Sequence, residues 1–291
     1  QKRPLMAKYS PKDRHIDICI RKRVGPADGK GPFAGYSLEY NALPEIDLSE
    51  IDTSLHFMDW KLSAPLIINS MTGGAERGGK INANLARAAH SRGIALFLGS
   101  AKTAIKNKSA LKTFQVRKHC PGIPLFANLG LADLDKSYTI EDCRELVKSI
   151  EADGLVFYIN PLHEALQPDG NTSFRGLSEK LRRAVGDLEF PVIVKEVGHG
   201  ISAPVVQKLS KIPGLSAIDI SGSGGTDWAL VEMRVHKDEG MKEICRTFSG
   251  VGRTSAEILD ALAGKKIAVP LIASGGIRTG VDVVKSLCLG A

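Results

Sequence analysis

Short apolar runs alternate along this chain with stretches in which apolar residues recur every three or four positions. The apolar runs are typical of buried parallel strands and lie at residues 62–69, 94–99, 125–129, 155–159, 191–197, 217–220 and 270–274. The periodic stretches predict amphipathic helices over residues 79–92, 109–118, 139–150, 178–185, 202–210 and 254–262, with a last helix that begins at Thr279 or Gly280. Strand and helix therefore alternate from residue 62 to residue 291.

The spacing of the strand ends indicates the architecture. The first four predicted strands end near Ser70, Ser100, Gly130 and Asn160, about thirty residues apart, which is typical of parallel βαβ units. The pattern shows no reversal of strand order, so it favours a TIM (β/α)₈ barrel over an open parallel sheet. Only seven strands are predicted, and a seven-stranded ring leaves an unpaired edge. We expect either that a C-terminal segment of the barrel is missing from the sequence or that other elements close the gap.

Residues 1–61 form an N-terminal arm and lead-in before the barrel of residues 62–291. Residues 1–35 are polar, basic and rich in glycine and proline. Such a segment is typical of a solvated arm, and the alternative is an arm folded over a site to supply cations to an anion. Residues 36–58 carry few helix signals and are predicted to be extended connecting structure.

Composition narrows the possible partners. The net charge of +7 suits a phosphorylated ligand, although it also serves solubility, and only 5% of residues are aromatic. Without basic and aromatic residues interleaved, nucleic acid is not an expected partner. The five cysteines show no CxxC spacing, which indicates reduced thiols and a cytoplasmic location. No apolar run reaches the length of a membrane span, so no membrane partner is expected.

In a barrel the active site lies at the carboxyl ends of the strands. This rule selects Met71, Thr72, Gly73, Ser100, Lys102, Asn128, Tyr158, Asn160, His163, Glu164, Lys195, Glu196, Ser221, Thr226, Gly275, Gly276 and Arg278. Most of these residues are small or form hydrogen bonds, as an enclosed polar ring system requires.

Lys195 is the most informative of these residues because its side chain begins within a predicted strand. A buried lysine is costly unless it meets an anion or an electron-rich group. The ordinary alternative, an ion pair with Glu196, is disfavoured because neighbours on a strand point to opposite faces. Glu164 is either a surface carboxylate or a ligand for Mg²⁺ that bridges substrate phosphates. His163 is either a surface or core histidine, or a proton donor with a pKa near neutrality.

Two adjacent glycines, Gly275 and Gly276, separate the last predicted strand from its helix. Glycines at this point let the backbone approach a ligand, and the free N–H groups of a helix start can hold a phosphate. The alternative is an ordinary tight turn between a strand and a helix.

Six stretches together resemble the type 2 isopentenyl-diphosphate isomerases, a likeness that runs from about Lys12 to Ala291. They are NALPEIDLSEIDTS (41–54), LSAPLIINSMTGG (62–74), FANLG (126–130), INPLHEALQPDG (159–170), VKEVGHGIS (194–202) and ASGGIRTGVDV (273–283). The last motif is shared by several flavin barrels.

The resemblance implies a TIM barrel that carries FMN at its mouth and assembles as a homo-oligomer, a tetramer or larger. It implies interconversion of isopentenyl and dimethylallyl diphosphate with reduced flavin and Mg²⁺ and no net redox change, with NAD(P)H as the reductant. The reduced flavin is the implied acid and base.

The resemblance also implies roles for individual residues. FMN is assigned to Met71, Thr72, Gly73, Ser100, Asn128, Lys195, Ser221, Thr226, Gly275, Gly276 and Arg278. The substrate is assigned to Lys12, His15, Lys102 and Asn160, and the metal ion to Glu164. Lys195, at the N1/C2 carbonyl edge of the flavin, and His163 are the expected catalytic residues.

The chain departs from the family pattern mainly in the substrate motifs. Pro11, Lys102, Tyr158, His163 and Asn171 stand where the family usually has Arg, Arg, His, Gln and Asp. Two alternatives therefore stay open. One is a flavin-binding paralogue with altered or no isomerase activity.

The other alternative is an FMN-dependent 2-hydroxy-acid oxidase, which has a similar barrel. That family places a catalytic His and an Arg after strand six, where this chain has Ser223, Gly224, Gly225 and Thr226. Neither a base nor a carboxylate-binding arginine is present in that run, which argues against an oxidase.

Overall fold

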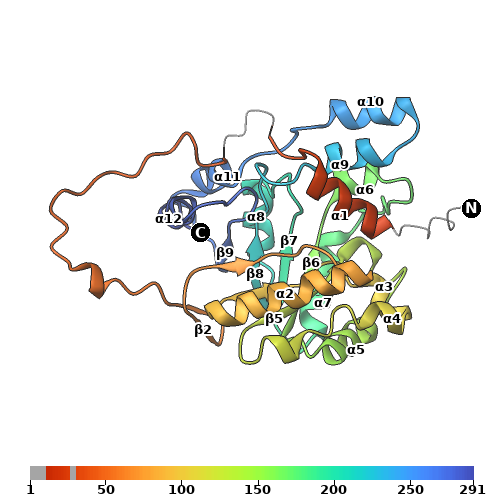
Figure 1. Ribbon diagram of the computed structural model, residues 1–291, viewed down its shortest axis with the longest axis horizontal. Coiled ribbons are helices and arrows are strands. Elements are labelled where there is room, and N and C mark those ends of the chain that lie inside the picture. The colour runs from red at the N-terminus through yellow and green to blue at the C-terminus, as the bar shows by residue number, and fades with distance from the viewer. Residues whose placement is uncertain (1–10, 27–30) are drawn as a thin grey trace, which may run out of the picture.

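The computed structural model describes residues 11–26 and 31–291, and its centre is one parallel sheet of seven strands (Figure 1). Each strand pairs with the next one along the chain, which is the arrangement expected of consecutive βαβ units. The strands are β3 (Ile67–Ile68), β4 (Ala95–Phe97), β5 (Leu125–Gly130), β6 (Gly154–Tyr158), β7 (Val192–Lys195), β8 (Leu215–Asp219) and β9 (Leu271–Ile272).

Helices follow the strands as the periodicity predicts. They are α2 (Glu76–Arg92), α5 (Ile140–Ile150), α7 (Leu177–Asp187), α8 (Ala203–Leu209), α11 (Ser255–Leu262) and α12 (Gly280–Cys288). Three of them begin at capping boxes, in which Thr139, Thr254 and Thr279 exchange hydrogen bonds with an acidic residue three positions later.

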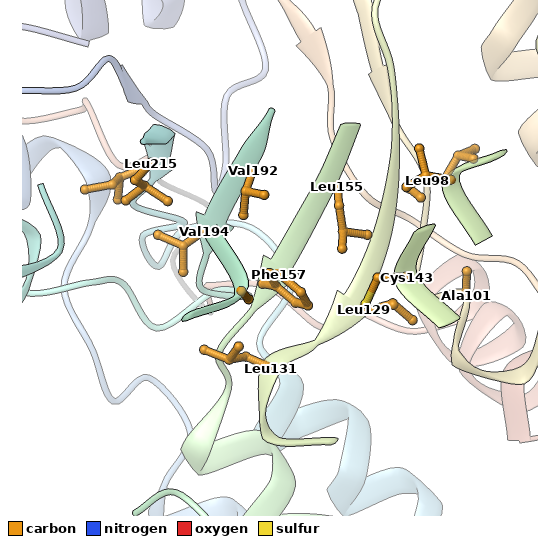
Figure 2. Packing of buried hydrophobic residues seen from close by; sticks show 14 of the residues in the cluster. Leu98, Ala101, Leu129, Leu131, Cys143, Leu155, Phe157, Val192, Val194 and Leu215 are labelled. Carbon is orange, nitrogen blue, oxygen red and sulfur yellow. The ribbon is translucent and has the colours of Figure 1, made fainter. Parts of the chain in front are cut away.

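The alternation of side chains along the strands separates two cores. Phe97, Phe126, Val156, Ile193 and Ala217 face the inside of the curved sheet and form one buried cluster. Their neighbours along the strands pack outward against the helices in a second and larger cluster. Figure 2 shows part of this larger cluster, with Leu155, Phe157, Val192 and Val194 on adjacent strands. The inner cluster therefore fills the barrel below the carboxyl ends of the strands.

An antiparallel hairpin of β1 (Leu55–Phe57) and β2 (Trp60–Leu62) extends the inner cluster. Trp60 packs edge-on against Phe126, with ring centroids 6.2 Å apart. The predicted strand over 62–69 is wrong in extent, because Leu62 belongs to the hairpin and only Ile67–Ile68 join the sheet. Pro65 separates the two pieces, and proline has no N–H to give to a sheet.

Two further parts of the chain differ from the prediction. No continuous helix forms over 109–118, where the structure has α4 (Lys108–Leu111) and a 3₁₀ turn, Arg117–His119. Helix α3 (Lys102–Lys106) precedes them. The stretch after β8, read as a polar excursion, contains α9 (Trp228–Val235) and α10 (Glu239–Thr247).

The N-terminal arm is not a solvated segment where the structure describes it. Residues Pro11–Arg21 form helix α1, and Ile16 and Ile18 on it are buried. Figure 1 shows α1 beside α9. Phe33 is also fully buried. Residues 36–54 are extended apart from the 3₁₀ turn Leu48–Glu50, as predicted, and loop away from the sheet and its helices (Figure 1).

β3 and β9 are the outer strands of the sheet and do not pair with each other. A cavity of about 860 Å³ lies between them, lined in part by Leu55, Ile67, Leu271 and Leu287. The described elements therefore leave the ring open at this side. No helix in the described ranges has both the length and the apolar character needed to cross a bilayer.

Candidate active site

A ring of polar side chains lies one step above the inner apolar cluster. Asn128, Tyr158, Lys195 and Asp219 each lie two residues beyond a member of that cluster on the same strand. Side chains two apart on a strand share a face, so these four point into the barrel mouth. Asn128, Tyr158 and Lys195 line a cavity of about 540 Å³ at this end of the sheet.

This smaller cavity brings most of the predicted site residues together. The members that line it are Lys12, His15, Met71, Ser100, Lys102, Asn128, Asn160, His163, Glu164 and Lys195. Three more of the predicted residues are buried in the segments that follow β3 and β8, namely Thr72, Gly73 and Ser221. Gly275 and Gly276 line the larger cavity instead, Thr226 is half-buried, and Arg278 is exposed.

The Lys195 ammonium is buried at the mouth, with 6% of the residue exposed. Its Nζ donates a hydrogen bond to the backbone oxygen of Glu196 at 2.5 Å, and it lies 4.0 Å from Asp219 Oδ2. The Glu196 carboxylate turns away and accepts hydrogen bonds from the backbone N–H groups of residues 198–200. The carboxylate nearest to the Lys195 ammonium is therefore that of Asp219, whereas Glu196 offers it only a backbone oxygen.

Asp219 is fully buried and was not among the predicted site residues. Its two oxygens accept hydrogen bonds from Asn69 Nδ2 and Ser274 Oγ, both at 2.6 Å, and from the backbone N–H of Ser221 at 3.0 Å. These bonds satisfy a charge that burial alone would make costly. Asp219 thus offsets the buried charge of Lys195.

Asn128 is a buried amide with one group unsatisfied. Its Nδ2 donates to Ser70 Oγ at 2.6 Å, whereas its Oδ1 has no hydrogen-bond partner in the part of the chain that the structure describes. Across the same cavity, Ser100 Oγ and Tyr158 Oη are 3.2 Å apart, and burial raises the pKa of Tyr158. A bound ring with an N–H group suits the free oxygen of Asn128.

Two glycine-rich loops meet beside the mouth. Gly275 and Gly276 both have positive φ, 100° and 78°. A Cβ on Gly275 would lie 1.8 Å from the Gly222 oxygen, and one on Gly276 would lie 2.5 Å from the Gly224 oxygen. Only glycine allows this approach of the two loops. The turn at Gly275 and Gly276, which was predicted to hold a phosphate, therefore abuts the loop after β8.

Two of the predicted site residues, His163 and Glu164, lie on the short helix α6 (Pro161–Leu166), which follows β6. Glu164 Oε1 accepts from Asn160 Nδ2 at 3.0 Å, and Glu164 Oε2 accepts from the backbone N–H of Asn171 at 2.7 Å. Asn160 and the Asn171 backbone therefore fix both carboxylate oxygens at the cavity wall.

His163 is buried on the same helix and contacts Glu232 of α9. His163 Nε2 lies 3.0 Å from Glu232 Oε1, and Asn160 Nδ2 lies 3.3 Å from His163 Nδ1. His163 Nε2 also lies 2.7 Å from Gln167 Nε2, so a carboxylate and an amide group both contact this ring nitrogen. His15 of α1 approaches the same Glu232 oxygen at 3.3 Å.

Glu232 and Trp228 complete this wall of the cavity and were missed from the sequence. Burial disfavours the ionised form of Glu232, but hydrogen bonds from His15 and His163 outweigh it and lower its pKa to about 2. The Trp228 ring stacks on His163 with centroids 4.5 Å apart and meets His15 edge-on at 5.6 Å. Asp227, which caps α9, was the available signal for a helix here.

Helix α1 brings cations to the cavity. Arg77 of α2 binds Asp17 at 2.9 Å and fastens α1 to the barrel. Lys12 and His15 then line the cavity, and burial lowers the pKa of the Lys12 ammonium. Lys102 also lines the cavity, and its Nζ lies 2.8 Å from Asp133 Oδ2, a carboxylate that was not predicted.

The donor set fits a flavin mononucleotide. The orphaned Asn128 oxygen, the Lys195 ammonium and two abutting glycine loops match the needs of a ring N–H, an electron-rich ring edge and a phosphate. Within the described ranges no group of three or more His, Cys, Asp or Glu side chains is placed to hold a metal ion. Glu164 suits Mg²⁺ only in the manner in which this ion commonly binds, with one or two carboxylates and the phosphates of a substrate.

Comparison with known proteins agrees with this donor set. Residues 170–291 match the family model of the FMN-dependent dehydrogenases. The chain is 41% identical to the isopentenyl-diphosphate delta-isomerase of Nostoc sp. over 282 residues, covering 97% of this chain and 80% of the relative. It is 43% identical to the enzyme of the same name from Synechocystis sp. over 283 residues, covering 96% of this chain and 80% of the relative.

Solved structures show the fold. The monotopic membrane protein (S)-mandelate dehydrogenase aligns with a TM-score of 0.63 at 16% identity, over 96% of this chain and 81% of its own. A mandelate oxidase variant aligns with a TM-score of 0.52 at 15% identity, over 84% of this chain and 68% of its own. These likenesses agree with the predicted α/β barrel fold.

Identity at this level over most of both chains, together with the polar cavity at the barrel mouth, decides the family. The chain belongs to the isopentenyl-diphosphate delta-isomerases.

Proposed function

We propose that this protein interconverts isopentenyl and dimethylallyl diphosphate with reduced FMN and Mg²⁺. A proton adds to the terminal alkene carbon and another leaves the carbon on the far side of the double bond, so no electrons are gained or lost overall. The observation that carries the proposal is the single cavity in which Lys195, Asn160, Glu164 and the cations of α1 converge.

In this proposal, cationic side chains bind the diphosphate and a carboxylate binds the metal ion. Lys12 and His15 bind the diphosphate, because a cation beside a phosphate gains a charge-assisted hydrogen bond. Glu164 ligates the Mg²⁺ that the diphosphate carries, and Asn160 orients that carboxylate. The relatives' names support the substrate.

The flavin end of the cavity belongs to Lys195 and Asn128. When bound, reduced FMN supplies the acid and base group for proton transfer. Lys195 offsets negative charge on the reduced ring, and Asn128 orients the ring through its unsatisfied oxygen. The loops at Ser221, Thr226, Gly275 and Gly276 hold the phosphate, with Met71, Thr72, Gly73, Ser100 and Arg278 as further contacts.

His163 and Glu232 hold a proton at the substrate end. Since His163 Nε2 lies 3.0 Å from Glu232 Oε1, the pair can share one proton without creating an isolated buried charge. Trp228 keeps the His163 ring in place by stacking. NAD(P)H as the reductant and a homo-oligomeric working form complete the proposal, as the sequence resemblance implies.

The test is an isomerisation assay on the FMN-loaded protein with Mg²⁺ and isopentenyl diphosphate. Dithionite-reduced protein should form dimethylallyl diphosphate, and the same protein with oxidised flavin should not. Glu164→Gln should abolish turnover while FMN stays bound. An inert reduced protein would favour a flavin-binding paralogue, and bleaching of the flavin by lactate or glycolate would favour a 2-hydroxy-acid oxidase.

A further inference from the structure

One wall of the 540 Å³ cavity contains a continuous chain of polar contacts between Lys102 and Glu164. Lys102 Nζ lies 2.8 Å from Asp133 Oδ2. The other oxygen, Asp133 Oδ1, accepts from Asn171 Nδ2 at 3.1 Å. The backbone N–H of Asn171 then donates to Glu164 Oε2 at 2.7 Å. The four residues come from α3, the 3₁₀ turn Leu131–Asp133, α6 and the loop after α6, so the contacts join three parts of the chain that are distant in sequence.

The loop that carries Asn171 packs closely against Glu164. A Cβ on Gly170 would lie 1.8 Å from the Glu164 backbone oxygen, so only glycine lets the loop fold back against α6. Asn171 Nδ2 also donates to the Ala132 oxygen at 2.9 Å. Asn171 is thus fixed on one side by the 3₁₀ turn Leu131–Asp133 and presents its N–H on the other.

Charge balance at this wall argues against Lys102 as a free phosphate ligand. Asp133 is buried, with 6% of the residue exposed, and Lys102 is the cation paired with it. Turning the ammonium toward a phosphate would leave a buried carboxylate without its partner, which is strongly unfavourable. Lys102, Asp133 and Glu164 together carry one net negative charge, which suits a divalent cation better than a diphosphate alone.

We propose that Asp133 and Asn171 are positioning residues for the metal-binding carboxylate, and that Lys102 serves this chain of contacts instead of binding the diphosphate directly. Asp133 holds Asn171 in place, and Asn171 aims Glu164 Oε2. The inference rests on the proposed role of Glu164. It reassigns Lys102, which the sequence resemblance placed on the substrate.

The experiment measures the dissociation constant of inorganic pyrophosphate on the FMN-loaded full chain by calorimetry, with and without saturating Mg²⁺. The ratio of the two constants is the metal enhancement. Asp133→Ala and Asn171→Ala should each lower this enhancement about tenfold, as the loss of partners of a metal ligand commonly does. Asn171→Ala buries no unpaired charge, so it tests the same chain of contacts if Asp133→Ala does not fold.

Lys102→Met separates the two assignments of the lysine. It should lower the metal enhancement while changing the metal-free constant less than twofold. Ser137→Ala is the matched control, because it removes only the 3.4 Å hydrogen bond from Ser137 Oγ to Asp133 Oδ1, the oxygen that Asn171 also contacts. This variant should change neither dissociation constant. FMN affinity and the thermal midpoint should stay unchanged in Asn171→Ala, which excludes a merely structural effect.

Two results would overturn the inference. One is a tenfold or greater loss of metal-free pyrophosphate affinity in Lys102→Met, which would return the lysine to the diphosphate. The other is an undiminished metal enhancement in Asp133→Ala or Asn171→Ala. If the unsubstituted protein shows no metal enhancement at all, the metal-binding part of the proposed function fails, and this inference fails with it.

Discussion

Lys195 lies two residues beyond Ile193 on β7, and this spacing places its ammonium above the inner apolar cluster and inside the barrel mouth. Glu196 is one residue further and turns to the backbone N–H groups of the following loop. The contrast between the two neighbours was predictable, because successive strand residues face opposite sides. Asp219, which balances the charge of Lys195, was not identified, because its contacts with Asn69 and Ser274 join residues far apart in sequence.

Glu232 gives a prediction at the same scale. Its pKa is lowered from 4.5 to about 2, so its ionised form stabilises the folded state at pH values above 4.5. That contribution is lost as the pH falls from 4.5 through about 2. A shift of this size corresponds to at most about 3 kcal/mol.

The measurement is the free energy of unfolding by urea as a function of pH. Glu232→Gln should be less stable than the unsubstituted protein at pH 6, and the difference should shrink as the pH approaches 2. Glu145→Gln changes an exposed glutamate on α5 and should show no such trend. A difference for Glu232→Gln that stays constant between pH 6 and pH 2 would contradict the role of His15 and His163 as its partners.

At the scale of elements, the glycine loops after β8 and β9 give the clearest prediction. Gly275→Ala would place a methyl group 1.8 Å from the Gly222 oxygen at a residue with positive φ. We expect a loss of about 1–3 kcal/mol in unfolding free energy and weaker FMN binding, because the two loops would separate. Thermal unfolding and a fluorescence titration with FMN measure these two effects.

Gly280→Ala is the matched control for this prediction. Gly280 opens α12, and a Cβ there meets no atom within 4 Å. The variant should be neutral or more stable by up to about 1 kcal/mol and should bind FMN normally. Equal FMN affinity in both variants would show that the abutting loops do not matter for the phosphate.

The elements also show what a sequence can and cannot predict. Helices α5, α11 and α12 were predicted near their true starts because Thr139, Thr254 and Thr279 each form a local capping box. Helices α1 and α9 were missed. Ile18, Val24 and Val231 bury one another across that interface, and such long-range packing leaves little local signal.

The residues of the candidate site were likewise predictable where the signal is local and missed where it depends on long-range packing. Residues at the ends of strands, such as Asn128 and Lys195, were predictable from the barrel rule alone. Glu232 and Trp228 were not, because the helix that carries them was read as a polar excursion. Asp133 was also missed, since it lies in a short 3₁₀ turn after β5 that periodicity does not reveal.

At the scale of the whole molecule, a layer of polar and charged side chains lies above the inner cluster of packed apolar side chains. The strands supply Lys195, Asn128 and Asp219, the helices after them supply Glu164 and Glu232, and α1 adds Lys12 and His15 from above. In the proposed function the flavin occupies the end of the cavity beside β7 and β8, and the diphosphate occupies the end beside α1. The proposed function requires FMN at the first of these ends.

The most direct test of this claim is an FMN titration followed by a reductive titration on the full chain, comparing Lys195→Met with the unsubstituted protein. Lys208→Met, which removes an exposed lysine of α8, is the control. We expect one FMN per chain and a midpoint potential that is lower in Lys195→Met alone, because a cation beside the ring favours the reduced flavin. A chain that binds no FMN, or a potential that Lys195→Met leaves unchanged, would contradict it.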